Sequence, residues 1–230
     1  MNSGIIKKIF REKDLRNIQN KLNKLGNNKK MSAVEFLSLR IITLIILAII
    51  LILFKVKYYI IIFTLVAYYN LFYYIFITQP LIKRTKKLDR EALTFFEILT
   101  LTLESGRNLE NSLEITCYNI DSELSGEFKR CLMEVKFGKS FMEALEDLKL
   151  RIPSDTINNI ILNIKETSIF GNSIVDVMNN QVDFLREKQI MEVKSLINKI
   201  PNKVSIVSVL FVVPLILLII LGPFIISLLG

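Results

Sequence analysis

The apolar residues of this chain follow two kinds of pattern along its length. In the regions 36–80 and 204–230 they form long runs that suit membrane-spanning helices. In residues 81–203 they recur every three or four positions, which is the spacing of amphipathic helices. No segment there alternates apolar and polar residues as a strand would. The chain is therefore predicted to be all-α, with a basic segment at 1–35, two apolar regions and a polar helical domain between them.

The first apolar region predicts a transmembrane hairpin. One arm covers residues 36–54 and leaves Arg40 to extend towards the lipid headgroups. Residues 55–57 form a short turn, and residues 58–78 form a second arm with aromatic side chains near both ends. The run at 204–230 contains no charged residue. Three transmembrane helices are therefore predicted.

The polar domain predicts six amphipathic helices with short connections. Their apolar faces begin near residues 88, 109, 124, 141, 157 and 174, and the last helix is expected to end at about Lys199. Short connections favour antiparallel neighbours. Residues 81–203 are therefore predicted to fold as a six-helix antiparallel bundle.

A short phrase recurs at three of the joints in this bundle. A glycine is followed two positions later by Asn or Ser, in the pairs Gly106 and Asn108, Gly138 and Ser140, and Gly171 and Ser173. Glycine adopts the left-handed conformation that ends a helix, and Asn or Ser caps the amides of the next one. We expect these six residues to be structural helix corners and not a ligand site.

The basic N-terminal segment leaves two interpretations open. Its apolar positions Ile5, Ile6, Ile9, Phe10, Ile18, Leu22 and Leu25 are compatible with an amphipathic helix at a membrane surface. A solvated basic tail is the other interpretation. The long basic region, with no small-residue cleavage site after it, does not fit a signal peptide.

Charge is distributed unevenly along the chain. Residues 1–40 carry ten Lys and Arg against three Asp and Glu, whereas residues 91–185 carry eight against sixteen, within a total net charge of +8. Because the basic residues flank the apolar regions, membrane orientation explains them better than nucleic-acid binding does. The N-terminus and the helical domain are predicted to be cytoplasmic, and the C-terminus outside.

The chain offers little for catalysis or for ligand binding. It has no histidine, and it lacks phosphate-binding, dinucleotide-binding and Cys-x-x-Cys motifs. Cys117 and Cys131 lie on apolar helix faces and are expected to be buried thiols. Acidic pairs such as Glu110 and Glu114 are typical of solvated helix faces. No catalytic, cofactor or metal site is predicted.

The order of these features resembles the type II secretion F family of inner-membrane platform proteins, and most closely the TadC-type subunit of the tight-adherence (Tad/Flp) pilus. The resemblance covers about residues 86–228. It rests on the segments 103–109, 137–145, 150–155, 171–174, 184–186, 200–203 and 221–224. The chain departs from the family pattern in having Asn108 where Ser is usual, and in an irregular first span.

The resemblance implies a non-catalytic platform protein without a cofactor, built on a six-helix F domain. It implies a multi-pass protein of the inner membrane that couples a cytoplasmic secretion ATPase to the extraction of pilin subunits from the bilayer. The implied partners are that ATPase, a second F-type platform subunit, prepilin or pilin subunits and membrane lipid, in an oligomer.

Three other functions are alternatives to this platform role. A small-solute transporter or channel component would need ionisable groups near the middle of the spans, which are uncharged there. A membrane-bound enzyme would have to build its site from Asp and Glu alone. A different membrane-anchored scaffold would share the same sequence features.

Overall fold

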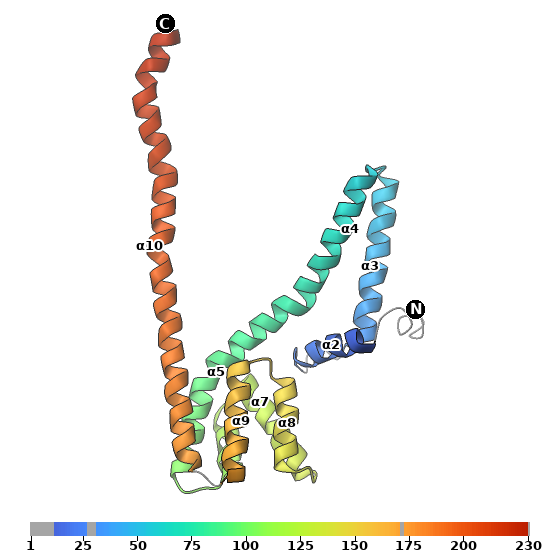
Figure 1. The fold of residues 1–230 in the computed structure, drawn as a ribbon, viewed down its shortest axis with the longest axis vertical. Coiled ribbons are helices and arrows are strands. Elements are labelled where there is room, and N and C mark those ends of the chain that lie inside the picture. Colours follow the sequence, from blue (N-terminus) through green and yellow to red (C-terminus); the bar gives the residue numbers. More distant parts are fainter. Residues whose placement is uncertain (1–11, 27–30, 171–172, 230) are drawn as a thin grey trace. The chain divides into compact units, whose positions relative to one another are not determined.

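The computed structural model describes residues 12–26, 31–170 and 173–229, and within these ranges all regular structure is helical (Figure 1). The chain divides into two compact units, Met1–Gln181 and Val182–Gly230. The first contains α2 to α9 and the start of α10, and the second contains the rest of α10. The all-α prediction is confirmed for the described residues.

The N-terminal helix α2 (Glu12–Asn23) lies against the base of a helical hairpin. Its Leu22 is buried in one cluster with Phe36, Leu37, Phe72 and Ile77. The apolar face of α2 is thus covered by the chain itself and is not a free amphipathic face. Residues 1–11, which include the first four apolar positions of the predicted segment, lie outside the described residues.

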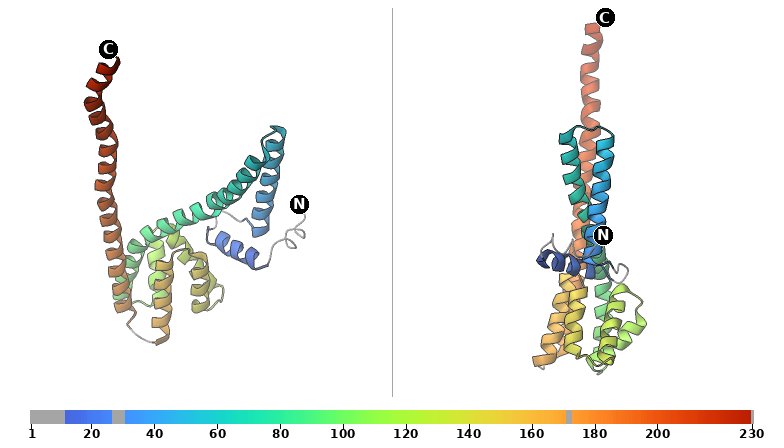
Figure 2. Two further views of the ribbon diagram at one scale, coloured as in Figure 1. Left: turned by 45° about the horizontal axis from the view of Figure 1, so that its top comes forward. Right: turned by 90° about the vertical axis from the view of Figure 1, so that its right-hand side faces the viewer.

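The hairpin consists of α3 (Ala33–Leu53) and α4 (Tyr58–Tyr73), which lie side by side (Figure 2). Ser32 starts α3 with a capping box: its hydroxyl accepts from Glu35 N, and the Glu35 carboxylate accepts from Ser32 N. The first arm therefore begins three residues earlier than its apolar run, because the polar cap and not the first apolar side chain sets the helix start.

Arg40 does not extend to the lipid headgroups as its sequence position predicts. Its side chain is buried, and Nη2 donates a hydrogen bond of 2.7 Å to the carbonyl of Tyr69 on α4. The guanidinium carbon lies 3.4 Å from the centre of the Tyr69 ring, which is a cation–π contact. Through this hydrogen bond and ring contact, Arg40 joins the two arms of the hairpin.

The second arm continues into the helical domain without a break. A π-helical turn, η1 (Tyr74–Thr78), connects α4 to α5 (Gln79–Glu104), and the Gln79 amide donates to the Tyr74 carbonyl five residues earlier. Pro80 in the first turn of α5 has no amide hydrogen, and its ring would clash with a carbonyl four residues before it. The wider turn accommodates the proline while the helix goes on.

The polar domain contains α5 and four shorter helices: α6 (Leu109–Asn119), α7 (Glu123–Lys136), α8 (Phe141–Arg151) and α9 (Asp155–Phe170). Contacts between α5 and α6, α6 and α7, α7 and α8, and α8 and α9 join them in sequence, and α5 also touches α7 and α9. The core is filled by buried apolar side chains, among them Phe95 and Phe128, whose rings stack 4.7 Å apart. Five of the six expected bundle helices therefore share one core.

The sixth expected helix is longer than predicted. α10 runs from Ile174 to Leu229 as one helix, so the prediction that it ends near Lys199 is wrong. The helix continues through Pro201. The expected bundle helix and the expected C-terminal span are thus one secondary-structure element.

Two helical segments of the described chain are long and apolar enough to cross a membrane, Ala33–Leu53 and the continuous stretch Tyr58–Glu104. Only 17% and 6% of the residues in their most apolar windows are buried, and side chains such as Ile49 and Phe63 are exposed. A shorter apolar stretch, Ser208–Leu221, lies in α10. The first two segments agree with the predicted hairpin, and the third span remains a prediction.

Gly138 and Gly126 differ in backbone conformation, so the same substitution at the two positions is expected to change stability in opposite directions. Gly138 has φ +96°, whereas Gly126 lies inside α7, and a Cβ at either position would meet no atom within 4 Å. Gly138→Ala is expected to lower the free energy of unfolding by about 1–2 kcal/mol, the cost of the left-handed conformation. Gly126→Ala is expected to raise it by about 0.5–1 kcal/mol, because alanine favours the helix.

Thermal unfolding of the full chain in detergent, followed by circular dichroism, measures both changes. Destabilisation by Gly138→Ala with stabilisation by Gly126→Ala is the expected pair. Two changes of the same sign would contradict the assigned backbone conformations.

Candidate functional site

The predicted corner residues form two tight helix-to-helix turns in the described chain. Gly106 has φ +83° and Gly138 has φ +96°, each just after a helix end. The Asn108 side chain accepts a hydrogen bond of 2.9 Å from Asn111 N, and the Ser140 hydroxyl accepts one of 3.2 Å from Glu143 N. These residues cap backbone amides and leave no group directed at a ligand.

The third corner is only partly described. Gly171 lies outside the described residues, and the Ser173 hydroxyl accepts from Asp176 N at 3.4 Å.

Because the bundle helices run alternately up and down, every second connection lies at the same end. The corners after α5 and α7 accordingly lie at the end of the bundle away from α2 (Figure 1).

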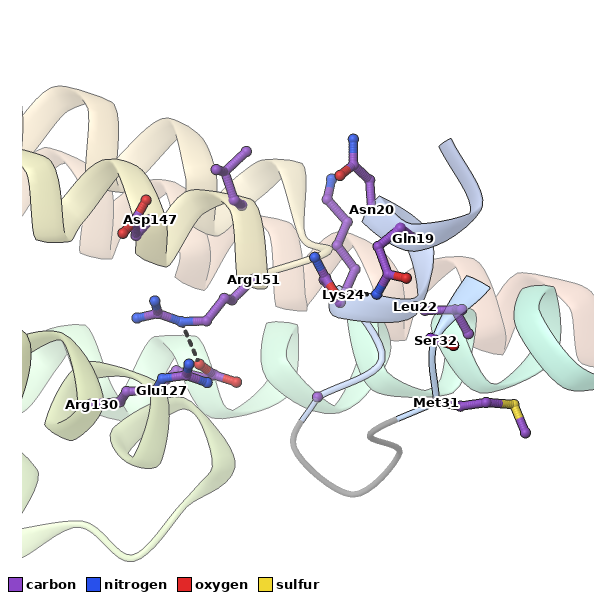
Figure 3. Close-up of a pocket in the computed structure, with 13 residues that line it drawn as sticks. Gln19, Asn20, Leu22, Lys24, Met31, Ser32, Glu127, Arg130, Asp147 and Arg151 are labelled. Atoms are coloured by element: carbon purple, nitrogen blue, oxygen red, sulfur yellow. Dashed lines mark hydrogen bonds and ion pairs between the residues drawn. The ribbon is translucent and has the colours of Figure 1, made fainter. Parts of the chain in front are cut away.

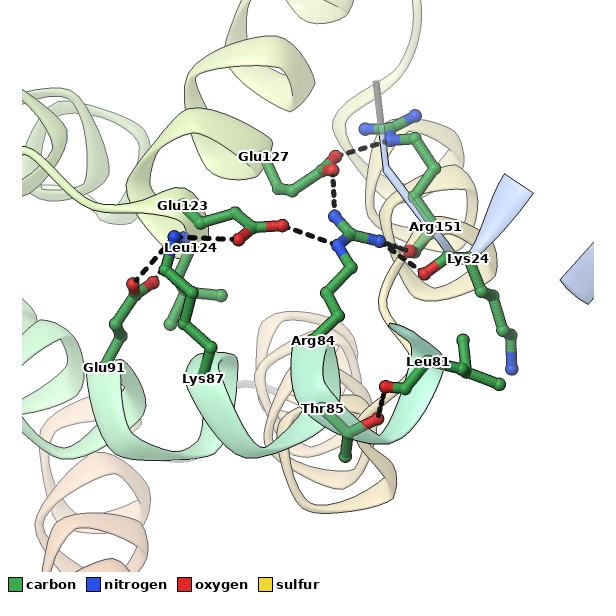
Figure 4. Close-up of polar contacts among 10 residues, drawn as sticks. All are labelled: Lys24, Leu81, Arg84, Thr85, Lys87, Glu91, Glu123, Leu124, Glu127 and Arg151. Atoms are coloured by element: carbon green, nitrogen blue, oxygen red, sulfur yellow. Dashed lines mark hydrogen bonds and ion pairs between the residues drawn. The ribbon is translucent and has the colours of Figure 1, made fainter. Parts of the chain in front are cut away.

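The opposite end of the bundle holds a buried ion-pair cluster centred on Arg84 of α5 (Figure 4). The Arg84 side chain is 6% exposed, and its Nε and Nη2 atoms each lie 2.6 Å from a carboxylate oxygen, the first of Glu123 and the second of Glu127. Its Nη1 donates to two backbone carbonyls, at 2.7 Å to Lys24 and at 2.9 Å to Arg151. One guanidinium thus binds α7, the end of α8 and the segment between α2 and α3.

The two glutamates are held by further cations. Glu123 also pairs with Lys87 at 3.1 Å, and the second oxygen of Glu127 pairs with Arg151 at 3.2 Å. Arg151 Nη1 lies 2.9 Å from Glu134, which follows Glu127 by about two turns of α7. The cluster therefore extends from α5 across α7 to α8, with cations and carboxylates alternating.

The electrostatics of the cluster favour its charged state. Burial by itself would raise the pKa of Glu123, but hydrogen bonds and attraction from Arg84 and Lys87 outweigh it and lower that pKa below the ordinary glutamate value. A buried arginine is stable only when its charge and its N–H groups are matched. We call the residues Arg84, Glu123, Glu127 and Arg151, with the carbonyl of Lys24, the Arg84 junction.

The approach of the α2–α3 segment to Arg84 depends on a glycine. Gly26 has φ +87°, and a Cβ built there would lie 3.0 Å from the Arg84 Cζ and Nε atoms. A larger residue would therefore be strained in its backbone and would push against the guanidinium. Gly26 lets the segment that follows α2 touch the bundle at this one point.

A cavity of about 710 Å³ lies beside the junction, between α2 and the α7–α8 pair (Figure 3). Most of the charged side chains that line it are already paired: Glu127 with Arg151, Arg130 with Glu134, and Asp147 with Lys139. The described residues contain no group of three or more Cys, Asp or Glu side chains arranged to hold a metal ion. The cavity therefore lies where α2 meets the α7–α8 pair, and its charged side chains do not form a cluster of unpaired groups directed at a ligand.

Cys117 and Cys131 are both free and buried, as their positions on apolar faces predict. Burial raises the pKa of each thiol to about 11, so both remain protonated near neutral pH. Neither is placed for nucleophilic chemistry.

Sequence reasoning missed the Arg84 junction. Arg84 stands within the basic run 83–87, and the position of this run directly after the hairpin predicts a membrane-flanking cluster. Helical periodicity offered one signal, since Arg84 lies four residues before Leu88 and eight before Ala92, on the buried face of α5. Its partners come from positions up to 67 residues away, which no local pattern reveals.

The junction makes a prediction about Arg84. Arg84→Met is expected to lower the free energy of unfolding by about 3–5 kcal/mol, because it leaves two backbone carbonyls without this donor and reduces Glu123 and Glu127 to one cation each, Lys87 and Arg151. Arg84→Lys is expected to be destabilising too, since an ammonium group cannot reach four acceptors in the plane of a guanidinium. The exposed neighbour Lys86 is the control, and Lys86→Met is expected to change stability by less than about 0.5 kcal/mol.

Thermal unfolding of the full-length variants in the same detergent measures these differences. An Arg84→Met protein as stable as the Lys86→Met control would show that the junction does not hold the fold together.

Comparison with known proteins places the chain in a family. The family model for type II secretion system (T2SS), protein F, matches residues 95–222, more than half of the 230 residues. The match begins in α5, includes α6 to α9, and ends within α10. No curated protein and no solved structure matches the chain. Proteins of this family are non-catalytic platform proteins associated with the inner membrane. The chain belongs to the type II secretion system protein F family.

Proposed function

We propose that this protein is the inner-membrane platform of a Tad/Flp-type pilus or a related type II secretion apparatus. In this role it couples a cytoplasmic secretion ATPase to the extraction of pilin subunits from the membrane. The family assignment supports a platform protein for secretion or pilus assembly. The pilus type and the coupling to an ATPase are part of the proposal.

The observation that carries the proposal is the continuous helix between the apolar hairpin and the polar bundle. The helix that starts at Tyr58 continues through η1 into the bundle core and ends at Glu104. The Arg84 junction adds a second connection, from α7 and α8 to the α2–α3 segment. Force applied to the bundle would therefore reach the hairpin by two routes, which is what transmission to a membrane-embedded subunit requires.

The proposed topology follows the distribution of charge. The basic residues before α3 and the run 83–87 after the hairpin would both remain cytoplasmic. The bundle would then face the cytoplasm, the apolar part of α10 would cross the membrane, and the C-terminus would lie outside. Within this layout the bundle is available to the ATPase, and the apolar helices to pilin, lipid and a second F-type subunit.

Co-purification tests the proposal. The tagged full chain, produced at its native level and extracted in a mild detergent, is expected to bring down a hexameric secretion ATPase and a second F-type membrane subunit. An unrelated multi-pass protein with the same tag, taken through the same extraction, is the control. Recovery of the chain alone, with neither partner enriched over that control, would contradict the proposed role.

A further inference from the structure

One helix of the acidic bundle carries a basic and apolar outer face. The exposed positions Lys129, Met133 and Lys136 of α7, and Phe137 directly after it, include no carboxylate, although residues 91–185 carry twice as many acidic as basic side chains. Lys136 pairs with Glu114 of α6 at 2.6 Å. Phe137 is 90% exposed and Met133 is 51% exposed. Lys129 forms no ion pair with any described residue. Apolar anchors among cations are unusual on a free surface and typical of a protein interface.

A glycine on the same face has no role inside the chain. Gly126 precedes Lys129 by three residues and Met133 by seven, so all three lie on one stripe. A Cβ at Gly126 would meet no atom within 4 Å, so nothing in the described structure requires the missing side chain. A helical glycine costs about 1 kcal/mol relative to alanine. Close approach by a second backbone is a reason for tolerating that cost.

The stripe borders a shallow apolar groove between α6 and α7. The groove has a volume of about 310 Å³, and Cys117, Tyr118, Leu132 and Met133 provide its apolar lining. Tyr118 on its edge is 88% exposed. The groove lies between two antiparallel helices and has an apolar lining, which suits the packing of a third helix along it.

A stripe of complementary chemistry lies on α9. Its exposed positions are Asp155, Asn159, Leu162 and Glu166, and Leu162 in the middle is 36% exposed. Neither Asp155 nor Glu166 forms an ion pair with a described residue. Both stripes repeat at alternating spacings of three and four residues, which is the spacing of helix seams that pack side by side.

We infer that the α7 stripe docks against the α9 stripe of a second copy of this chain. With Met133 opposite Leu162 and the helices antiparallel, position 129 meets position 166, and position 136 meets position 159. Lys129 then faces Glu166, and Lys136 faces the Asn159 amide. Gly126 and the groove give the incoming helix room to approach.

This contact joins two different faces of the same chain. Such head-to-tail contacts propagate from copy to copy and either close into a ring or continue as a row. The inference deepens the proposed platform role by naming the surface through which copies assemble. The contact itself is measured below without any readout of pilus assembly, so its failure would leave the platform proposal standing.

Cysteine cross-linking in bacterial membranes tests the contact. A full chain carrying both Met133→Cys and Leu162→Cys is expected to give a ladder of dimers and higher species on mild oxidation. Each single variant and the natural chain are expected to remain monomeric, because Cys117 and Cys131 are buried. The absence of a ladder from the double variant would overturn the inference, as would equal cross-linking of Met133→Cys alone, which indicates a symmetric contact.

Charge reversal gives a second, independent test. Lys129→Glu or Glu166→Lys alone is expected to weaken self-association of the detergent-purified chain by about tenfold or more, since each places like charges together. An equimolar mixture of the two variants is expected to regain association, because the reversed charges complement each other across the contact. Arg107→Glu, at an exposed position away from both stripes, is the matched control and should associate as the natural chain does. Single variants that associate normally, or a mixture that does not recover, would overturn the inference.

Discussion

The burial of one positive charge constrains the whole first unit. Arg84 has left water, so the N–H groups of its guanidinium need acceptors, and the chain supplies two carboxylates of α7 and two carbonyls from other segments. Those acceptors come together only when α5, α7, the end of α8 and the α2–α3 segment are all in place. Apolar packing fills the bundle, but this polar geometry selects how the segments near the hairpin are arranged.

The two ends of the bundle serve different purposes. The corners at Gly106 and Gly138 are short turns, each made by a left-handed glycine and a capping side chain whose hydrogen bond is local. The other end carries the Arg84 junction, the continuous helix through η1 and the contact with α2. A bundle that is joined to the hairpin at one end by a continuous helix and by the Arg84 junction, and that ends in simple turns at the other, suits a part that receives force and passes it to the membrane.

Local patterns in the sequence predicted the helices and their corners well, because helical periodicity and capping are properties of neighbouring residues. Local patterns gave wrong predictions where residues far apart in the sequence determine the structure. The second arm and the first domain helix were expected as separate elements, and the sixth helix was expected to end near Lys199, but a π-helical turn accommodates Pro80 and α10 continues through Pro201. Arg40 and Arg84 were interpreted as membrane-flanking charges, yet a carbonyl of α4 receives one and α7 the other. In both cases the partner is fixed by tertiary packing, which the sequence around the arginine does not encode.

The central claim is that Arg84 holds the α2–α3 segment to the bundle, and a distance measurement tests it directly. Spin labels placed at the exposed positions Asn17 on α2 and Glu143 on α8 report their separation by pulsed electron resonance. The account predicts one narrow distance distribution in the natural background and with Lys86→Met, and a broad distribution with Arg84→Met. A distribution that stays equally narrow with Arg84→Met would contradict the account.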